Sequence, residues 1–209
     1  LPDYQTQSGC VDIMMHTMER YFNQSGSMDM TDRISEALLK IVMKYAKVLQ
    51  GEPQNYEARA EVMWAGSLSH NGLTDCGTDG GDWATHRLEH ELGGMFDVAH
   101  GAGLAAVWGS WARYVCEAAP ERFSAFAWNV MDVSRELSSM DAALAGIEAM
   151  EAYFRSVNMP VSVSDMGIRL TDAQIEELSE KCSIADSITI GVVKRLKKSD
   201  MIKIYQMAK

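Results

Sequence analysis

Asp12 and His16 are the first residues in the chain whose types and spacing suggest chemistry. They lie four residues apart, so a helix would place both side chains on one face. The helix predicted around them, residues 8–22, is apolar on every side, which is typical of a buried helix. Because a buried carboxylate without a partner is costly, we expect Asp12 either to pair with His16 in the first turn or to bind a metal ion with it. The spacing alone leaves both interpretations open.

Three more of the five histidines fall within fifteen residues. His86 and His90 lie one turn apart on a predicted helix, and His100 follows ten residues after His90. Neutral imidazoles combined with one carboxylate suit Zn²⁺ or Fe²⁺. The alternative is a pair of surface histidines beside Glu89 and Glu91. Together with Asp12 and His16 the cluster favours a metal site, but spacing does not decide whether His90 or His100 belongs to it.

Several known metal and nucleotide motifs do not fit the sequence. The segment HELGG at 90–94 lacks the second histidine of the zinc-protease pattern HExxH, because Gly94 stands in its place. No histidine has a glutamate three residues before it, and no His-Asp dipeptide occurs. The segment GAGLAA at 101–106 matches the dinucleotide fingerprint, but no good strand precedes it. We interpret these small residues as allowing a helix to begin close to another backbone.

The elements that must position these residues are predicted to be helices almost throughout. Apolar residues recur with helical spacing in the following segments: 8–22, 31–50, 55–69, 82–95, 101–118, 120–133, 140–157 and 200–207. Thr31 and Ser199 are expected helix caps, and Thr171 with Gln174 has the spacing of a capping box. Residues 161–163 give a weak strand signal. We expect a single all-α domain over residues 1–209.

The composition excludes several classes of function. The chain has 209 residues, 47% of them apolar and 23% charged, which describes a globular protein. Its net charge of −10 argues against a nucleic-acid partner or an anionic membrane surface. No apolar run approaches the ~20 residues of a membrane helix, and the first residues lack the pattern of a signal peptide. The four widely spaced cysteines are interpreted as reduced thiols, and we expect a cytoplasmic protein.

The other polar and aromatic residues that stand out are interpreted as structural. His70 and Asn71 are expected to end a helix and not to belong to a site. Four aromatic residues are expected in the core: Trp83, Trp108, Trp111 and Tyr114.

Three segments resemble one known family. They are residues 9–22 (GCVDIMMHTMERYF), 63–73 (MWAGSLSHNGL) and 82–115 (beginning DWATHRLEHELGG). Each is similar to a motif of the iron-containing (group III) alcohol dehydrogenases, in the butanol-dehydrogenase-like branch. The resemblance covers most of the chain and implies the C-terminal helical domain of a dehydroquinate synthase-like fold.

The resemblance also implies roles for single residues. In the family one divalent metal is held by an Asp and a His four residues apart and by two later histidines fourteen residues apart. Here those positions are Asp12, His16, His86 and His100. His90 corresponds to a histidine beside the substrate and the nicotinamide that does not bind the metal, and we expect it to relay a proton. Fe²⁺ is the metal we expect, with Zn²⁺ as the alternative.

The activity that the resemblance implies is the interconversion of primary alcohols and aldehydes with NAD(P). A divalent ion lowers the pKa of an alcohol, which eases hydride transfer to the nicotinamide. Family members begin with an α/β domain whose Gly-rich loop holds the cofactor, and nothing like it occurs in residues 1–209. We therefore expect such a domain to be a required partner, and we expect a homo-oligomer. The alternatives are a non-catalytic helical interaction module and a metal-dependent hydrolase.

Overall fold

The computed structural model describes residues 1–26 and 28–209, and within this part the chain folds into nine α-helices and no multi-residue strand. This confirms the predicted all-α class. Three short 3₁₀ turns, Leu73–Asp75, Cys116–Ala118 and Ser164–Met166, join them. The helices are α1 (Asp3–Tyr21), α2 (Asp29–Gly51), α3 (Tyr56–His70), α4 (Ala84–Phe96), α5 (His100–Val115), α6 (Pro120–Asn129), α7 (Ser139–Ser156), α8 (Asp172–Cys182) and α9 (Lys198–Ala208).

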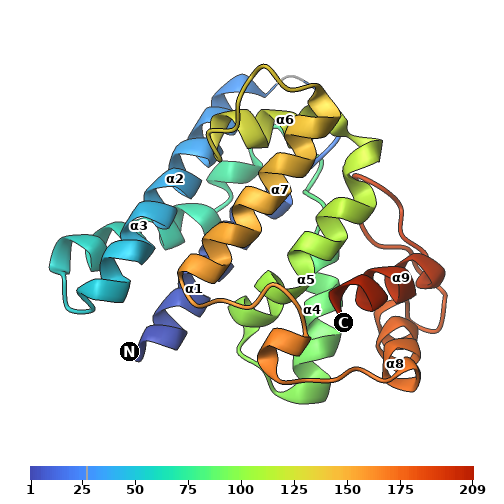
Figure 1. The fold of residues 1–209 in the computed structure, drawn as a ribbon. Helices are drawn as coiled ribbons and strands as arrows, with labels where there is room; N and C mark the ends of the chain where they lie inside the picture. Colours follow the sequence, from blue (N-terminus) through green and yellow to red (C-terminus); the bar gives the residue numbers. More distant parts are fainter. Residues whose placement is uncertain (27) are drawn as a thin grey trace.

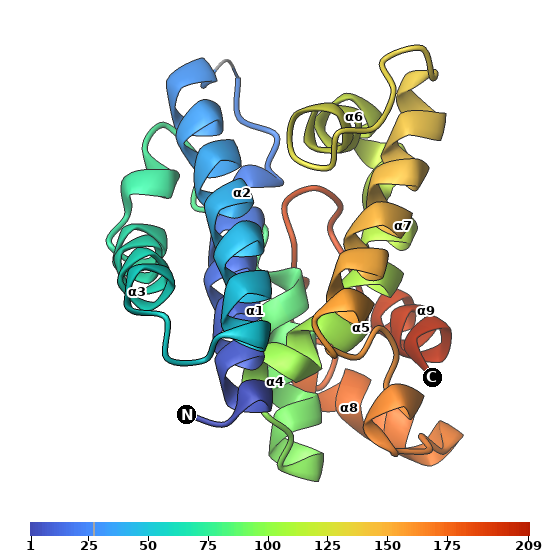
Figure 2. The same cartoon turned by 60° about the vertical axis from the view of Figure 1, so that its left-hand side comes forward.

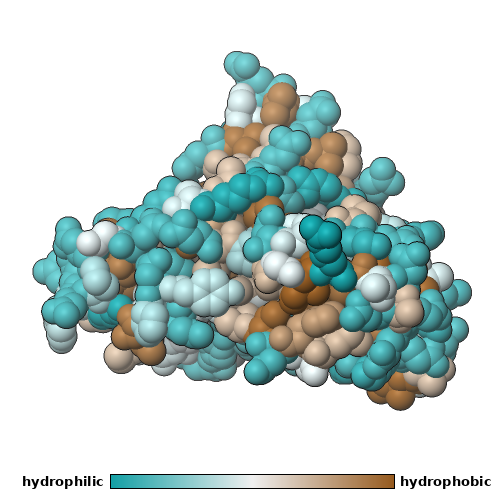
Figure 3. All heavy atoms as spheres, turned by 60° about the horizontal axis from the view of Figure 1, so that its bottom comes forward, coloured by the Kyte–Doolittle hydropathy of each residue, from teal (hydrophilic) through white to brown (hydrophobic). Residues whose placement is uncertain are grey.

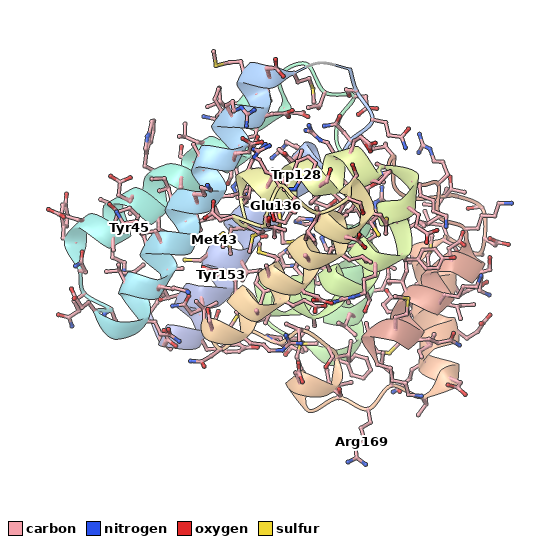
Figure 4. The ribbon with its side chains drawn as sticks, turned by 45° about the horizontal axis from the view of Figure 1, so that its top comes forward. Met43, Tyr45, Trp128, Glu136, Tyr153 and Arg169 are labelled. Atoms are coloured by element: carbon pink, nitrogen blue, oxygen red, sulfur yellow. The ribbon has the colours of Figure 1, made fainter. Side chains whose placement is uncertain are left out.

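Helix α5 lies in the middle of the molecule. It packs against α1, α4, α7 and α9, so that α1–α3 lie on one side of it and α6–α7 on the other (Figures 1 and 2). Every residue from Gly101 to Ala112 is buried, because the sequence there consists mostly of glycine, alanine and large apolar residues. Away from α5, the two sides meet where the Tyr153 hydroxyl of α7 donates to the Met43 carbonyl of α2 at 3.3 Å (Figure 4).

The small residues at the start of α5 let it cross α1 at close range. A Cβ atom on Gly101 would lie 1.9 Å from the carbonyl oxygen of Ser8, so only glycine fits this position. The Ser8 hydroxyl accepts the backbone N–H of Ala102 at 3.2 Å. This agrees with our interpretation of the GAGLAA segment as a close helix approach. It also brings His100, the first residue of α5, next to α1.

Two of the expected helix starts are confirmed in detail. Pro120 occupies the first turn of α6, where its missing N–H leaves no bond unmade. Thr171 and Gln174 form a capping box at α8, in which each side chain satisfies a backbone N–H of the other residue.

Three local predictions were wrong. Helix α2 begins at Asp29, so Thr31 lies inside it and its hydroxyl donates to a carbonyl in the loop after α3. Helix α9 begins at Lys198 and not after Ser199, because the carboxylate of Asp200 accepts the backbone N–H of Lys197 just before the helix. Residues 161–163 form no strand; they lie in a loop that leads into a 3₁₀ turn.

One face of the molecule is mostly hydrophilic. Figure 3 views the face at the bottom of Figure 1, where polar residues cover most of the area and an apolar region is open in its right half. In the part of the chain that the structure describes, no helix combines the length and the apolar character that crossing a bilayer requires.

Candidate metal centre

Four side chains from three helices meet at the Oδ1 atom of Asp12, where His86 and His100 form one candidate ligand group with it and His16 forms a second with His70. Asp12 and His16 come from α1, His86 from α4 and His100 from the first turn of α5. The Oδ1 atom of Asp12 lies 3.7 Å from Nε2 of His16, 3.8 Å from Nε2 of His86 and 3.4 Å from Nε2 of His100. The structure therefore brings together all four residues that the resemblance singles out.

The spacing of these atoms fits a bound divalent ion. Nitrogen and oxygen ligands lie about 2.1 Å from Zn²⁺, so neighbouring ligand atoms of a tetrahedral site are about 3.4 Å apart. Within the described residues, Oδ1 of Asp12 and Nε2 of His86 are buried and have no hydrogen-bond partner. Buried polar atoms are rarely left unpaired, and these two face each other at a distance too long for a hydrogen bond. The donor set and the unpaired atoms thus fit a metal ion between them.

The position of Asp12 argues against the simple Asp–His pair. Helix α1 begins at Asp3, five residues earlier than predicted, so Asp12 lies in the middle of the helix and not in its first turn. The helix dipole acts at the ends of a helix and does not stabilise a carboxylate at this place. The separation of 3.7 Å from His16 is also too long for a hydrogen bond.

Two buried glutamates hold two of the histidines in place. Oε1 of Glu19 accepts both the backbone N–H and the Nδ1–H of His86, each at 3.0 Å. Nδ1 of His100 donates in the same way to Oε2 of Glu89. Each bond fixes the tautomer that leaves Nε2 free to bind a cation.

Neither glutamate was predicted from the sequence, although one signal was available. Glu19 follows Asp12 by seven residues and His16 by three, so all three share one face of an apolar helix. Glu89 was considered only as a neighbour of surface histidines, and the structure buries it almost completely.

The loop before α4 places His86 against α1. Gly81 has φ +80, and a Cβ atom there would lie 2.7 Å from the carbonyl oxygen of Glu19. The backbone N–H of Asp82 donates to that same carbonyl at 2.7 Å, and the carboxylate of Asp82 accepts the N–H of Ala84 at 3.1 Å. The glycine-rich loop therefore anchors the start of α4 directly behind the glutamate that holds His86.

A hollow of about 430 Å³ opens beside these ligands. It is lined by His16, Trp83, His86, Arg87, His90 and His100. His90 is exposed, and its ring stacks on that of His100 with centroids 5.5 Å apart. The hollow gives a small molecule access to the four-residue cluster from solvent, with His90 at its side.

Two residues of the site were interpreted as structural from the sequence. Trp83 is only partly buried and lines the hollow, so its expected place in the core was wrong, whereas Trp108 and Trp111 are buried as predicted. His70 does end α3, but its ring also lies 3.9 Å from that of His16. Its position beside the cluster was missed because nothing in the local sequence relates α3 to α1.

The cluster shifts the pKa values of its own histidines in opposite directions. Burial lowers the pKa of His16 to about 4, which favours the neutral, metal-binding form. Burial also acts against the charged form of His86, but the carboxylates of Asp12 and Glu19 outweigh it and raise that pKa to about 9. The hydrogen bond to Glu89 raises the pKa of His100. In the absence of an ion, the neighbouring carboxylates therefore favour the protonated forms of His86 and His100, whereas burial favours the neutral form of His16.

A family model described as "Fe-containing alcohol dehydrogenase family, C-terminal" matches residues 6–209. The chain belongs to this family. NADH-dependent butanol dehydrogenase A of Clostridium acetobutylicum is 32% identical over 207 residues, which are 99% of this chain and 52% of that protein. The NADPH-dependent aldehyde reductase YqhD of Escherichia coli is 34% identical over 172 residues, which are 80% of this chain and 43% of that protein.

Solved structures of the Fe-containing alcohol dehydrogenase family have the same fold. The crystal structure of NADH-dependent butanol dehydrogenase A from Thermotoga maritima matches 100% of this chain with a TM-score of 0.92 and 33% identity. The match covers 53% of that chain. The chain thus spans about half the length of the curated relatives and solved structures it matches, and its family is the one predicted from the three sequence segments.

Proposed function

We propose that this chain supplies the metal-binding, substrate-facing part of an NAD(P)-dependent alcohol dehydrogenase that interconverts primary alcohols and aldehydes. The observation that carries the proposal is the meeting of Asp12 Oδ1 with three imidazole Nε2 atoms at 3.4–3.8 Å beside an open hollow. Relatives named as butanol dehydrogenases and an aldehyde reductase support the reaction class.

Asp12, His16, His86 and His100 would hold the divalent ion. When bound, such an ion polarises the oxygen of an alcohol or aldehyde and lowers the pKa of the alcohol. Fe²⁺ is the ion we propose, in line with the family description, and Zn²⁺ suits the same ligands.

Other residues in and around the hollow orient the metal ligands, exclude water from the substrate and move protons. The buried carboxylates of Glu19 and Glu89 keep two ligand rings in one orientation. Trp83 forms an apolar wall that limits the access of water to the reacting end of the substrate. His90 lies in the hollow outside the cluster and is exposed, so its ring nitrogens can pass a proton between the substrate and solvent. We propose that His90 also contacts the nicotinamide.

NAD(P) would be held mainly by a nucleotide-binding α/β domain of the family type, with its nicotinamide facing this hollow. The test is NADH and NADPH oxidation with butyraldehyde, measured for residues 1–209 alone and for the same residues joined to the nucleotide-binding part of the Clostridium relative. We expect turnover from the joined, metal-loaded protein and none from residues 1–209 alone. Asp12→Ala in the joined protein should abolish turnover.

The two competing functions predict different results in the same experiment. A metal-dependent hydrolase would turn over ester or amide substrates without any nicotinamide. A helical interaction module would bind no stoichiometric metal. A joined protein that is folded and loaded with metal but does not oxidise NADH or NADPH would contradict the dehydrogenase function, and robust turnover by residues 1–209 alone would contradict the role of the second domain.

A further inference from the structure

Two exposed arginines, Arg87 and Arg195, lie near the metal centre of an acidic protein. The chain carries 29 acidic against 19 basic residues, and Arg33, Arg113 and Arg122 each pair with a carboxylate. Among the residues that the structure describes, Arg87 and Arg195 form neither an ion pair nor a side-chain hydrogen bond. Both guanidinium groups are exposed and free to bind a ligand.

Both arginines line one small hollow of about 210 Å³, which we call the arginine hollow. One wall is the start of α4 with the residues just before it and carries Arg87, and the other is formed by residues 188–192 and Arg195. The second wall is a tight hairpin, because Ile190 and Leu196 exchange backbone hydrogen bonds of 3.1 and 2.8 Å. Arg87 therefore lies on helix α4, and Arg195 lies within the part of the α8–α9 connection that this bridge closes.

Asp82 joins the two walls. Its Oδ2 accepts the backbone N–H groups of Val192 at 2.7 Å and Val193 at 2.8 Å, while its Oδ1 accepts that of Ala84 at 3.1 Å. Although Asp82 also lines the arginine hollow, it is only 4% exposed and bonds to neither arginine. Its oxygens are occupied by three backbone N–H donors, so neither arginine is held by this carboxylate and both stay available to a ligand.

The arginine hollow adjoins the hollow of the metal centre. Trp83 and Arg87 line both of them. The ring of Trp83 lies 5.4 Å from that of His16 and 5.1 Å from that of His86. A molecule with one end at the metal ligands could therefore extend past Trp83 and reach the two arginines.

We propose that the arginine hollow binds an oxyanion, a carboxylate or a phosphate, carried by the molecule whose reacting end lies at the metal centre. A guanidinium group presents planar, paired N–H donors that match these anions, and such charge-assisted bonds are stronger than neutral ones. The link to the reacting molecule rests on the proposed function, whereas binding of the anion does not. The anion belongs either to an acidic aldehyde substrate or to the nicotinamide cofactor.

Anion binding is tested on the chain as it is, with inorganic phosphate and succinate as probes. ¹H–¹⁵N spectra that include the arginine side chains follow the titration, and the metal content of each sample is measured. Arg87→Gln and Arg195→Gln should each weaken binding of both probes at least about tenfold. The matched control is Arg169→Gln, because Arg169 is also exposed, lines neither hollow and projects outward from the molecule in Figure 4. It should leave the affinity unchanged.

No saturable binding in the millimolar range, or equal affinity in the wild type and in Arg195→Gln, would overturn the inference. If the chain binds the anions but holds no metal, the proposed function is contradicted and the anion site at the arginine hollow is supported. A metal-loaded chain that binds neither probe would overturn the arginine hollow alone.

A second titration of the metal-loaded chain identifies the source of the anion. Succinate semialdehyde is compared with butyraldehyde, and NADPH with NADH. If succinate semialdehyde binds more tightly than butyraldehyde, and Arg195→Gln abolishes this difference, the anion is a substrate carboxylate. If NADPH binds more tightly than NADH, and Arg195→Gln abolishes that difference, the anion is the cofactor phosphate. If Arg195→Gln changes neither comparison, the link between the arginine hollow and the reacting molecule is wrong.

Discussion

Replacing Glu19 by glutamine removes the negative charge behind His86 and keeps the size of the side chain. Glu19 is 2% exposed, and one of its oxygens accepts both the backbone N–H and the Nδ1–H of His86 at 3.0 Å. A glutamine carbonyl can accept the same bonds but holds the ring less firmly and makes it a weaker ligand. Loss of such an outer partner costs ten- to a hundredfold in metal affinity, or about 1.4–2.8 kcal/mol.

The assay for Glu19→Gln is a Zn²⁺ titration in competition with a chromophoric chelator, with urea unfolding of the metal-free chain to check the fold. Glu151→Gln is the matched control, since Glu151 is also a buried carboxylate but pairs with Arg113 on the opposite side of α5 from α1. It should bind Zn²⁺ like the wild type. If Glu19→Gln is folded and binds Zn²⁺ within twofold of the wild type, the carboxylate does not support His86 as we argue.

Three further changes test the packing and the site. Gly101→Ala would place a Cβ atom 1.9 Å from the Ser8 carbonyl oxygen and should lower the free energy of unfolding in urea by about 3 kcal/mol. Gly94→Ala is the control, because a Cβ atom there meets nothing within 4 Å on an exposed turn of α4. It should raise the free energy of unfolding by up to about 1 kcal/mol. Burial raises the pKa of Tyr205 well above 10, so above about pH 10 the unfolded chain releases a proton that the folded chain keeps. The contribution of Tyr205 to stability is therefore constant below about pH 10 and then falls. The wild type should lose about 1.4 kcal/mol per pH unit more than Tyr205→Phe in urea unfolding at pH 10–12. His90→Ala in the joined protein should keep its metal by elemental analysis and lose turnover about a hundredfold or more; loss of the metal instead would mean that the roles of His90 and His100 are exchanged.

The helices could be predicted from the sequence because their signals are local. Apolar periodicity located eight of the nine helices in the described part of the chain, and the capping box at Thr171 indicated the ninth, α8. The proline at residue 120 marked the start of α6 correctly. The starts of α2 and α9 were misplaced because Thr31 and Ser199 are good caps in isolation. In the folded chain the Thr31 hydroxyl donates to a loop carbonyl instead, and the carboxylate of Asp200 accepts the N–H at the start of α9 in place of Ser199.

The support of the metal centre could not be predicted because it depends on contacts between distant segments. Glu19 reaches a histidine 67 residues away, and His70 meets His16 across the interface of α3 and α1. Spacing identified Asp12, His16 and His86 as candidates, but only the resemblance favoured His100 over His90. The structure brings His100 to Asp12 through the close crossing of α5 and α1, which no local pattern encodes.

Metal stoichiometry in the double variant Asp12→Ala/His100→Ala tests the central claim most directly. Wild-type chain, the double variant and His90→Ala are purified without chelator under anaerobic conditions, loaded with Fe²⁺ or Zn²⁺, dialysed and measured by elemental analysis. The account predicts one ion per chain in the wild type and in His90→Ala, and no retained ion in the double variant, because it lacks two of the four converging ligands. Undiminished metal in the folded double variant would contradict a site built from Asp12, His16, His86 and His100.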